Sequence, residues 1–334
     1  MKKYIIYISI PKKHIIEVFK FKTPNFIKKI QEIYTNGEVQ PLKIIKKKNI
    51  LYAGVRKPSR IITYKIKKNG ILKKITEIKT IGNPNHFSID KKKKYLFNSS
   101  YGGNSISCHL LNKHSIPSKV FKTKSNISGC HCSVIDEKNK ILFFTSLLSD
   151  KIFIYSIKNI KKLFNKKIKK IQCSNKCGPR HVTIDRKKKY LYVINELKNS
   201  ISVWKIQDIL NKKKIKKIQT KKIIKKKLNK KWAADIHFSR CGNFLYASER
   251  INNSISLFKV KKKTGKIKLI KVYKTEKQPR SFKIDKKGRY LMVCGEKSNS
   301  VTIYFINKRN GFLKKIKKFS TIKEPLWIEI LKLI

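Results

Sequence analysis

Acidic residues are scarce in this chain of 334 residues, which has 18 Asp and Glu against 84 Lys and Arg and a formal net charge of +66. Long apolar runs are also missing, and no stretch approaches the roughly 20 residues that a membrane-spanning helix needs. No segment rich in Pro, Gly and Ser divides the chain, although its length exceeds the usual size of one domain. We therefore expect no membrane contact and one domain over residues 1–334.

The cysteines do not form a recognisable framework. There are seven, an odd number, with no regular spacing. Cys130, His131 and Cys132 could suggest a metal site, but alternation along a strand sends Cys132 away from His131, and no second half-site has zinc spacing. The N-terminal apolar run is too short for a signal peptide and has no small-residue cleavage site. We expect reduced thiols, no metal and a cytoplasmic protein.

The excess of lysine has two interpretations. A strongly basic chain is typical of proteins that contact the phosphates of nucleic acids. Lys, Asn and Ile are all used heavily here, however, and all three can be encoded by codons of A and T alone. The lysines also recur in turns along the chain, as at 91–94, 187–189 and 286–287, and do not gather in one segment. We favour compositional bias without a specific nucleic-acid partner, and expect the positive potential to attract small anions.

A pattern returns seven times: an apolar strand, a short basic turn, a second strand built on Leu-Tyr or a close equivalent, and a hairpin near Asn-Ser-Ile-Ser. The clearest copies pair 86–90 with 95–97, 181–185 with 190–192, and 282–285 with 290–292. Successive second-strand anchors are 45, 45, 46, 49, 54 and 46 residues apart; they are Ile6, Leu51, Leu96, Leu142, Leu191, Leu245 and Leu291. Repeats of this length with four short strands predict the blades of a β-propeller.

The order of the strands predicts how the ring closes. First strands are expected near 41–46, 86–90, 132–136, 181–185, 235–239, 281–285 and 326–331. The second strands begin at the N-terminus and the first strands finish at the C-terminus, so 327–330 should pair with 4–9. This closure would remove the free edges of the end blades. The predicted fold class is all-β, a seven-bladed β-propeller closed by pairing the C-terminal strand with the N-terminal blade.

Two sets of equivalent positions should form rings at one mouth of the central channel, since the start of an inner strand and the end of the second strand meet in an antiparallel hairpin. The first set contains Asn85, His131, Arg180, Ala234, Arg280 and Leu326. The second set contains Arg56, Tyr101, Leu147, Glu196, Arg250 and Glu296. Most are polar, whereas their flanking strands are apolar. Charges that converge on a water-filled mouth suit an active site for a polar anion; the alternative is a set of channel salt bridges, such as Arg180 with Glu196.

The histidines differ in how well their positions suit a catalytic role. His131 is the candidate general acid or base, because an unperturbed imidazole has a pKa of about 6.5. His86 and His181 occupy the next position, where a structural hydrogen-bonding role competes with substrate binding. His237 lies inside a strand. The remaining histidines are expected at the surface near hairpins; they are His14, His109 and His114.

These residues resemble the propeller-type 6-phosphogluconolactonases of bacteria, relatives of the fungal carboxymuconate cyclase, over essentially the whole chain. The resemblance lies in motifs that are specific in combination: Gly129-Cys-His131, Gly178-Pro-Arg-His181 followed by Asn195-Glu196, Trp232-Ala-Ala-Asp-Ile-His237, Gln278-Pro-Arg280 and Pro325-Leu-Trp327. The main departure is the lysine content of the loops. It includes the segment 207–231, for which a short helix and a mobile lid are the alternatives.

The resemblance implies hydrolysis of 6-phospho-D-glucono-1,5-lactone to 6-phospho-D-gluconate in the oxidative pentose phosphate pathway, with no metal or organic cofactor. His131, Arg180 and Glu196 look like the constellation proposed as the active site of that family, which implies catalytic roles for them. From the rings themselves, the residues expected to bind the substrate are Arg250, Arg280, His181 and Glu296.

Either His131 or Glu196 would take the proton from water, and His131 is favoured because a neighbouring arginine would lower the pKa of Glu196. An arginine would stabilise the oxyanion, and Arg180, Arg250 and Arg280 are the candidates for bidentate phosphate contacts. The alternatives are a lactonase or cyclase for another anionic lactone and a non-enzymatic propeller scaffold. A monomer is expected.

Overall fold

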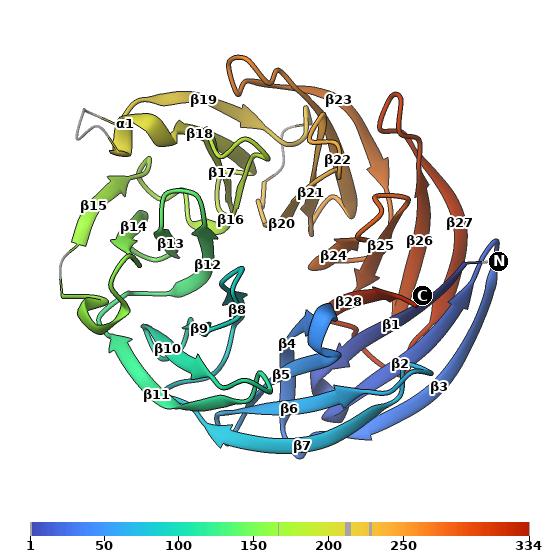
Figure 1. The fold of residues 1–334 in the computed structure, drawn as a ribbon. Coiled ribbons are helices and arrows are strands. Elements are labelled where there is room, and N and C mark those ends of the chain that lie inside the picture. Colours follow the sequence, from blue (N-terminus) through green and yellow to red (C-terminus); the bar gives the residue numbers. More distant parts are fainter. Residues whose placement is uncertain (1, 166, 211–214, 227–228, 334) are drawn as a thin grey trace.

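Seven four-stranded antiparallel sheets form a ring around a central axis (Figure 1). The computed structural model describes residues 2–165, 167–210, 215–226 and 229–333. The inner strands contact one another in the order β28, β4, β8, β12, β16, β20, β24 and back to β28. The all-β, seven-bladed propeller predicted from the repeat is therefore confirmed.

The blades follow one another along the chain, and each runs from an inner to an outer strand. The first three sheets comprise β28 (Trp327–Lys332), β1 (Lys3–Ile10), β2 (Ile15–Lys22) and β3 (Phe26–Tyr34); β4 (Glu38–Ile45), β5 (Ile50–Arg56), β6 (Arg60–Ile66) and β7 (Leu72–Lys79); and β8 (His86–Ile89), β9 (Tyr95–Ser100), β10 (Ser105–Leu111) and β11 (Pro117–Lys124). The next two comprise β12 (Cys130–Asp136), β13 (Ile141–Ser146), β14 (Lys151–Ser156) and β15 (Lys167–Gln172); and β16 (Pro179–Ile184), β17 (Tyr190–Asn195), β18 (Ser200–Lys205) and β19 (Lys217–Lys222). The last two comprise β20 (Ala233–Phe238), β21 (Phe244–Glu249), β22 (Ser254–Val260) and β23 (Ile267–Lys274); and β24 (Ser281–Ile284), β25 (Tyr290–Gly295), β26 (Ser300–Ile306) and β27 (Leu313–Ser320).

Helices are few and short in the described part of the chain. They are α1 (Ile206–Leu210) and three 3-10 turns at Pro11–Lys13, Lys46–Lys48 and Ile160–Lys162. None of the helices in this part is long and apolar enough to cross a bilayer. Of the segment 207–231, the structure describes residues 207–210, 215–226 and 229–231, which include the end of α1 and all of β19; a short helix, one of the two alternatives, is therefore present at its start. Residues 211–214 and 227–228 lie outside the described residues, and the alternative of a mobile lid falls partly on them.

The Leu-Tyr pattern of the second strands has two physical roles. The leucine packs in the apolar layer between blades, where Leu191 and Leu245 are fully buried. The tyrosine carries its hydroxyl across to the next blade, where it donates a hydrogen bond to a backbone carbonyl: Tyr192 to Gly265 at 2.8 Å and Tyr246 to Gly311 at 2.7 Å. A buried hydroxyl needs such a partner, so the repeated tyrosine links each of these blades to its neighbour.

The recurring aspartate closes the turn between the inner and second strands. Oδ1 of Asp185 accepts hydrogen bonds from the backbone N–H groups of Lys189 and Tyr190, both at 2.7 Å. Asp90 and Asp285 accept the equivalent bonds in their blades. These carboxylates therefore stabilise turns, away from the mouth where the polar rings were expected.

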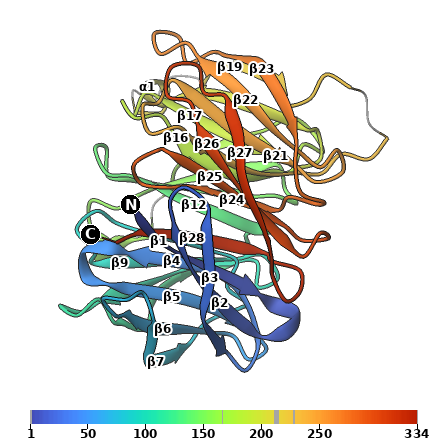
Figure 2. The ribbon, with the colours of Figure 1, turned by 90° about the vertical axis from the view of Figure 1, so that its right-hand side faces the viewer.

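The closure of the ring is as predicted. Strand β28 pairs antiparallel with β1, with Ile330 opposite Ile6 and Ile328 opposite Ile8. The side chains of Ile6, Ile8 and Ile328 are fully buried in one apolar cluster. Both ends of the chain therefore lie in the same blade, as the side view shows (Figure 2).

Candidate active site

β-Bulges at the starts of inner strands deliver the polar residues to the channel. In β16 the register jumps from Pro179 opposite Asn195 to Val182 opposite Val193, so Arg180 and His181 share one partner residue. Strands β12 and β20 have the same irregularity at residues 131–132 and 234–235. A bulge breaks the strict alternation of side chains and redirects them. Two consecutive residues of one strand can therefore contribute to the site.

Glu196, which follows β17, is the centre of the predicted site. Its Oε2 lies 2.8 Å from Nε of Arg180 and 3.0 Å from Nη2 of Arg250. Its Oε1 accepts a hydrogen bond from Nε1 of Trp232 at 3.1 Å. The guanidinium of Arg250 also stacks on the Trp232 ring, with 3.8 Å from Cζ to the ring centroid. The carboxylate thus fixes two buried guanidinium groups.

The electrostatic environment keeps Glu196 ionised. Burial alone would raise its pKa, but the charges of Arg180, Arg250 and Arg280 and the Trp232 hydrogen bond outweigh burial and lower the pKa below its ordinary value. Both carboxylate oxygens already face donors from Arg180, Arg250 and Trp232, so little capacity remains to accept a proton. Glu196 is better suited to orient the two arginines. The predicted contact between Arg180 and Glu196 is present, so the salt-bridge alternative describes part of this site.

Arg180 is held from several sides. Its Nη1 donates to the carbonyl oxygen of Ala234 at 2.5 Å and lies 3.3 Å from Nε2 of His181. Together with the ion pair to Glu196, these contacts fix the plane of the guanidinium. Among the described residues none accepts a hydrogen bond from its Nη2. One edge of a rigidly held guanidinium therefore remains for a ligand.

His131 lies beside Arg180, and its imidazole has no hydrogen-bond partner among the described residues. Its ring centroid is 5.0 Å from that of His181 and 5.9 Å from that of Tyr101. Its Nδ1 is buried without a hydrogen-bond partner, and no described residue bonds to the ring. Burial, followed by the charge of Arg180, lowers the pKa of His131 well below its ordinary value. The imidazole is therefore neutral at pH 7 and has a free lone pair.

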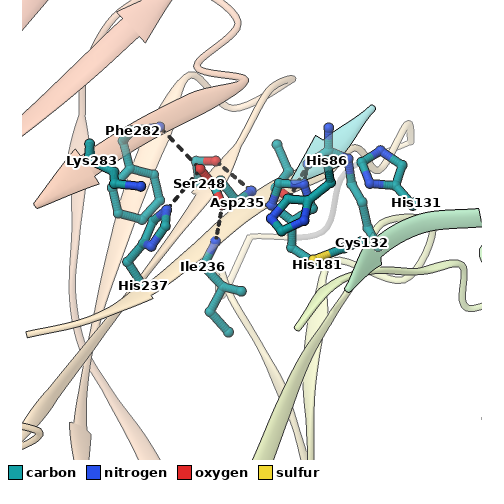
Figure 3. A network of polar contacts seen from close by, with 12 residues as sticks. His86, His131, Cys132, His181, Asp235, Ile236, His237, Ser248, Phe282 and Lys283 are labelled. Carbon is teal, nitrogen blue, oxygen red and sulfur yellow. Dashed lines mark hydrogen bonds and ion pairs between the residues drawn. The ribbon is translucent and has the colours of Figure 1, made fainter. Parts of the chain in front are cut away.

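A second carboxylate, Asp235, organises the channel below His131 (Figure 3). Its Oδ1 lies 2.7 Å from Nδ1 of His181 and its Oδ2 lies 3.1 Å from Nε2 of His237. The backbone N–H of Phe282 donates to the same carboxylate at 3.3 Å. A neutral His181 that donates from Nδ1 to Asp235 presents its Nε2 lone pair to Arg180. Asp235 thereby sets the tautomer of His181.

The other predicted binding residues lie at the same mouth with fewer contacts. Glu296 follows β25 and accepts a hydrogen bond from Nε2 of Gln278 at 2.7 Å. Arg280 precedes β24, and its charge acts on both Glu196 and His131. The structure therefore brings His131, Arg180, Glu196, Arg250 and Arg280 together, with His181 beneath them and Glu296 on the blade of Arg280.

Sequence reasoning missed Trp232 and Asp235 as site residues. Both belong to a quoted motif, but their partners lie on other blades, and no local spacing reveals such contacts. His109 was expected at the surface, but its side chain is fully buried and its Nδ1 lies 2.9 Å from the carbonyl oxygen of Ser118. That prediction is wrong. No group of three or more His, Cys, Asp or Glu side chains in the described ranges is placed to hold a metal ion.

The fold and this mouth define a class: seven-bladed propellers with arginines, a carboxylate and a neutral imidazole at one end of the channel. The family model described as lactonase, 7-bladed β-propeller, matches residues 5–330. The chain therefore belongs to the seven-bladed propeller lactonase family, which confirms the family expected from the motifs.

Curated relatives match one part of the chain. A 6-phosphogluconolactonase of Buchnera aphidicola subsp. Schizaphis graminum is 42% identical over 143 residues, which cover 42% of this chain and 43% of that protein. A 6-phosphogluconolactonase of Erwinia tasmaniensis is 30% identical over 143 residues, which cover 42% of each chain. The matched segment thus spans less than half the length of these relatives.

Solved structures match over nearly the full length at low identity. The periplasmic gluconolactonase of Pseudomonas aeruginosa has a TM-score of 0.88 and 17% identity, with 99% of this chain and 100% of that chain covered. A protein from Lactobacillus plantarum has a TM-score of 0.87 and 20% identity, with 99% and 100% covered. These similarities establish the fold.

Proposed function

We propose that this protein hydrolyses 6-phospho-D-glucono-1,5-lactone to 6-phospho-D-gluconate. The proposal rests on one observation in a chain of the lactonase family: the imidazole of His131, which is neutral and has no hydrogen-bond partner at Nδ1, lies beside the fixed guanidinium of Arg180. The names of the curated relatives support the phosphorylated substrate. We place the reaction in the oxidative pentose phosphate pathway of the cytoplasm. We further propose a monomer of one domain, 1–334, without nucleic-acid or membrane partners.

The attack step uses His131 as the base. Its free lone pair takes a proton from water as the water oxygen bonds to C1 of the lactone. The carbonyl oxygen gains the negative charge, and the open edge of Arg180 stabilises it. Glu196 contributes by holding Arg180 and Arg250 in place and keeps its own charge throughout.

The ring-opening step uses the same proton. The tetrahedral intermediate collapses, the bond between C1 and the ring oxygen breaks, and the imidazolium of His131 returns its proton to that oxygen. An imidazolium with a lowered pKa is a strong acid, so this transfer is favourable. The products are a carboxylic acid, which ionises, and a hydroxyl group. The scheme is balanced without a metal or organic cofactor.

The test is a coupled assay with variants. Glucose-6-phosphate dehydrogenase generates the lactone in place, and its loss is followed with the wild type, His131→Gln and Glu196→Gln. His114→Gln is the matched control, because His114 is exposed on the turn before β11. We expect acceleration by the wild type and the control, and a loss of about 10²–10⁴-fold in His131→Gln.

Two results would overturn parts of the scheme. A folded wild type that does not accelerate lactone loss would exclude the proposed reaction and favour a scaffold or another lactone. A fully active His131→Gln variant would exclude His131 as the base while leaving the reaction in place.

A further inference from the structure

Two arginines at the channel mouth, Arg56 and Arg280, form no direct ion pair with a carboxylate of the described residues. Glu196 forms ion pairs with Arg180 and Arg250. Glu38, which lies opposite Arg56 in the β4–β5 register, is not within ion-pair distance of it. Both side chains are partly exposed, so their unpaired guanidinium groups are accessible to a ligand at the mouth.

Arg56 is positioned by hydrogen bonds to neutral groups. Its Nη2 donates to Oδ1 of Asn85 at 2.9 Å, and its Nε donates to the carbonyl oxygen of Pro84 at 3.3 Å. Asn85 in turn donates from Nδ2 to the carbonyl oxygen of His131 at 2.9 Å. Arg56 is therefore held in a fixed place relative to the backbone of the proposed base, and its positive charge stays available to a ligand.

Arg280 has a fully available guanidinium. No described residue accepts a hydrogen bond from its side chain, so its five donors face no protein partner. Burial, then the charge of Arg180, lowers the pKa of Arg280 to about 10; the carboxylates of Glu296 and Glu196 act in the opposite direction, and the charge of Arg56 acts in the same direction as burial. Arg56 and Arg280 thus both contribute positive charge to the mouth. A dianion between them would relieve the repulsion between the two charges.

The order of the blades around the ring places Arg56 and Arg280 on one side of the mouth. Arg56 belongs to the β4–β7 blade and Arg280 precedes β24, and these two blades flank the closure blade with β28 (Figure 1). His131 and Arg180 lie on β12 and β16, on the opposite side of the ring. A substrate that spans the mouth would therefore have one charged end near the closure blade and its reacting end near His131.

We propose that Arg56 and Arg280 form the subsite that binds the phosphate of the substrate, while Arg180 and His131 act on the lactone carbonyl. This rests on the proposed function and extends it to a residue, Arg56, with no role in the scheme above. Arginine suits this task because its planar donors match phosphate oxygens in a bidentate way. Arg250 is assigned to Glu196 and Trp232 instead, since it forms an ion pair with the first and stacks on the ring of the second.

The experiment compares two substrates that differ only in the phosphate. KM and kcat are measured for 6-phospho-D-glucono-1,5-lactone and D-glucono-1,5-lactone with the wild type, Arg56→Met and Arg280→Met, at 0.15 M salt so that exposed lysines are largely screened. Arg309→Met is the matched control, because Arg309 is exposed on the turn before β27. Urea midpoints establish that all variants are folded.

We expect each of the two substitutions to raise KM for the phosphorylated lactone about 10–100-fold, the loss of one charge-assisted contact. The preference for the phosphorylated over the unphosphorylated lactone, measured as the ratio of kcat/KM, should fall by the same factor, whereas Arg309→Met should leave this ratio unchanged. Arg56→Lys should recover part of the affinity, since it restores charge without the planar fork. If the variants keep the wild-type preference for the phosphorylated lactone, the subsite is wrong and the reaction stands.

A second measurement separates the subsite from catalysis. Titration calorimetry with 6-phospho-D-gluconate and with D-gluconate measures phosphate recognition without turnover. If the wild type hydrolyses neither lactone, the proposed reaction fails. The subsite then stands if 6-phospho-D-gluconate binds the wild type and not Arg56→Met or Arg280→Met, and it falls if the wild type does not prefer the phosphorylated acid.

Discussion

The buried histidines of the channel should make the protein less stable as the pH falls. His181 is buried, and burial together with the charge of Arg180 lowers its pKa to about 4. In the unfolded chain the pKa is about 6.5. Below that pH the unfolded state binds a proton that the folded state does not, so the free energy of unfolding decreases with acid until the pH approaches the folded pKa.

The magnitude follows from the two pKa values. Each pH unit in this window is worth about 1.4 kcal/mol. From pH 7 to pH 5, His181 alone should therefore remove about 2 kcal/mol from the free energy of unfolding. His86 and His131 act in the same direction, because burial also lowers the pKa of each well below its ordinary value.

The assay is urea unfolding at pH 7 and pH 5, followed by tryptophan fluorescence and far-UV circular dichroism. Coincident transitions would establish two-state unfolding. The variant His181→Gln should lose about 2 kcal/mol less than the wild type between the two pH values, whereas His114→Gln, at an exposed site, should lose as much as the wild type. An unchanged pH dependence in His181→Gln would refute the reasoning.

Three further substitutions test other parts of the structure. Glu196→Gln removes the charge from two buried ion pairs and should lower the free energy of unfolding by about 3–5 kcal/mol, measured by urea unfolding. Ile328→Ala opens a cavity in the closure blade and should cost about 2–5 kcal/mol by the same assay, against less than about 0.5 kcal/mol for Ile322→Ala, which is 49% exposed. Gly178→Ala should cost roughly 1–2 kcal/mol, because φ is +62° there and a Cβ would lie 2.9 Å from Cγ of Leu197; the thermal midpoint should fall accordingly.

Each of these has a clear contrary outcome. An unchanged urea midpoint in Glu196→Gln would mean that the carboxylate does not stabilise the arginines. Equal losses in Ile328→Ala and Ile322→Ala would contradict the tight packing of the closure blade. A neutral Gly178→Ala would show that the loop before β16 relaxes around a side chain.

The fold was predictable because its determinants repeat. Each second strand carries a leucine, or Ile6 in the closure blade, for the layer between blades, and tyrosines such as Tyr192 and Tyr246 bond to the next blade. Asp185 and its equivalents close the turns through backbone N–H groups, which places them at a fixed distance before each second strand. These local requirements recur in blade after blade, so one sequence can be aligned to itself.

The site was predictable only where blade geometry alone determines it. Equivalent hairpin positions converge at the mouth, which placed Arg180, Glu196 and Arg250 together. The bulges in β12, β16 and β20 could not be read from alternation; Arg180 and His181 were both assigned to the site, but the bulge that lets two consecutive residues contribute to it was not predicted. The role of Asp235 depends on a side chain of its own strand, a side chain of one neighbouring blade and a backbone N–H of the other, and no spacing along the chain reveals these contacts.

The most direct test of the account is the fate of 6-phospho-D-glucono-1,5-lactone in the presence of the purified wild-type chain. Nuclear magnetic resonance at pH 7 can follow the lactone and 6-phospho-D-gluconate together, beside a buffer blank and His131→Gln. The account predicts that the wild type forms 6-phospho-D-gluconate faster than the blank and that His131→Gln matches the blank. A folded wild type that follows the spontaneous rate would contradict it.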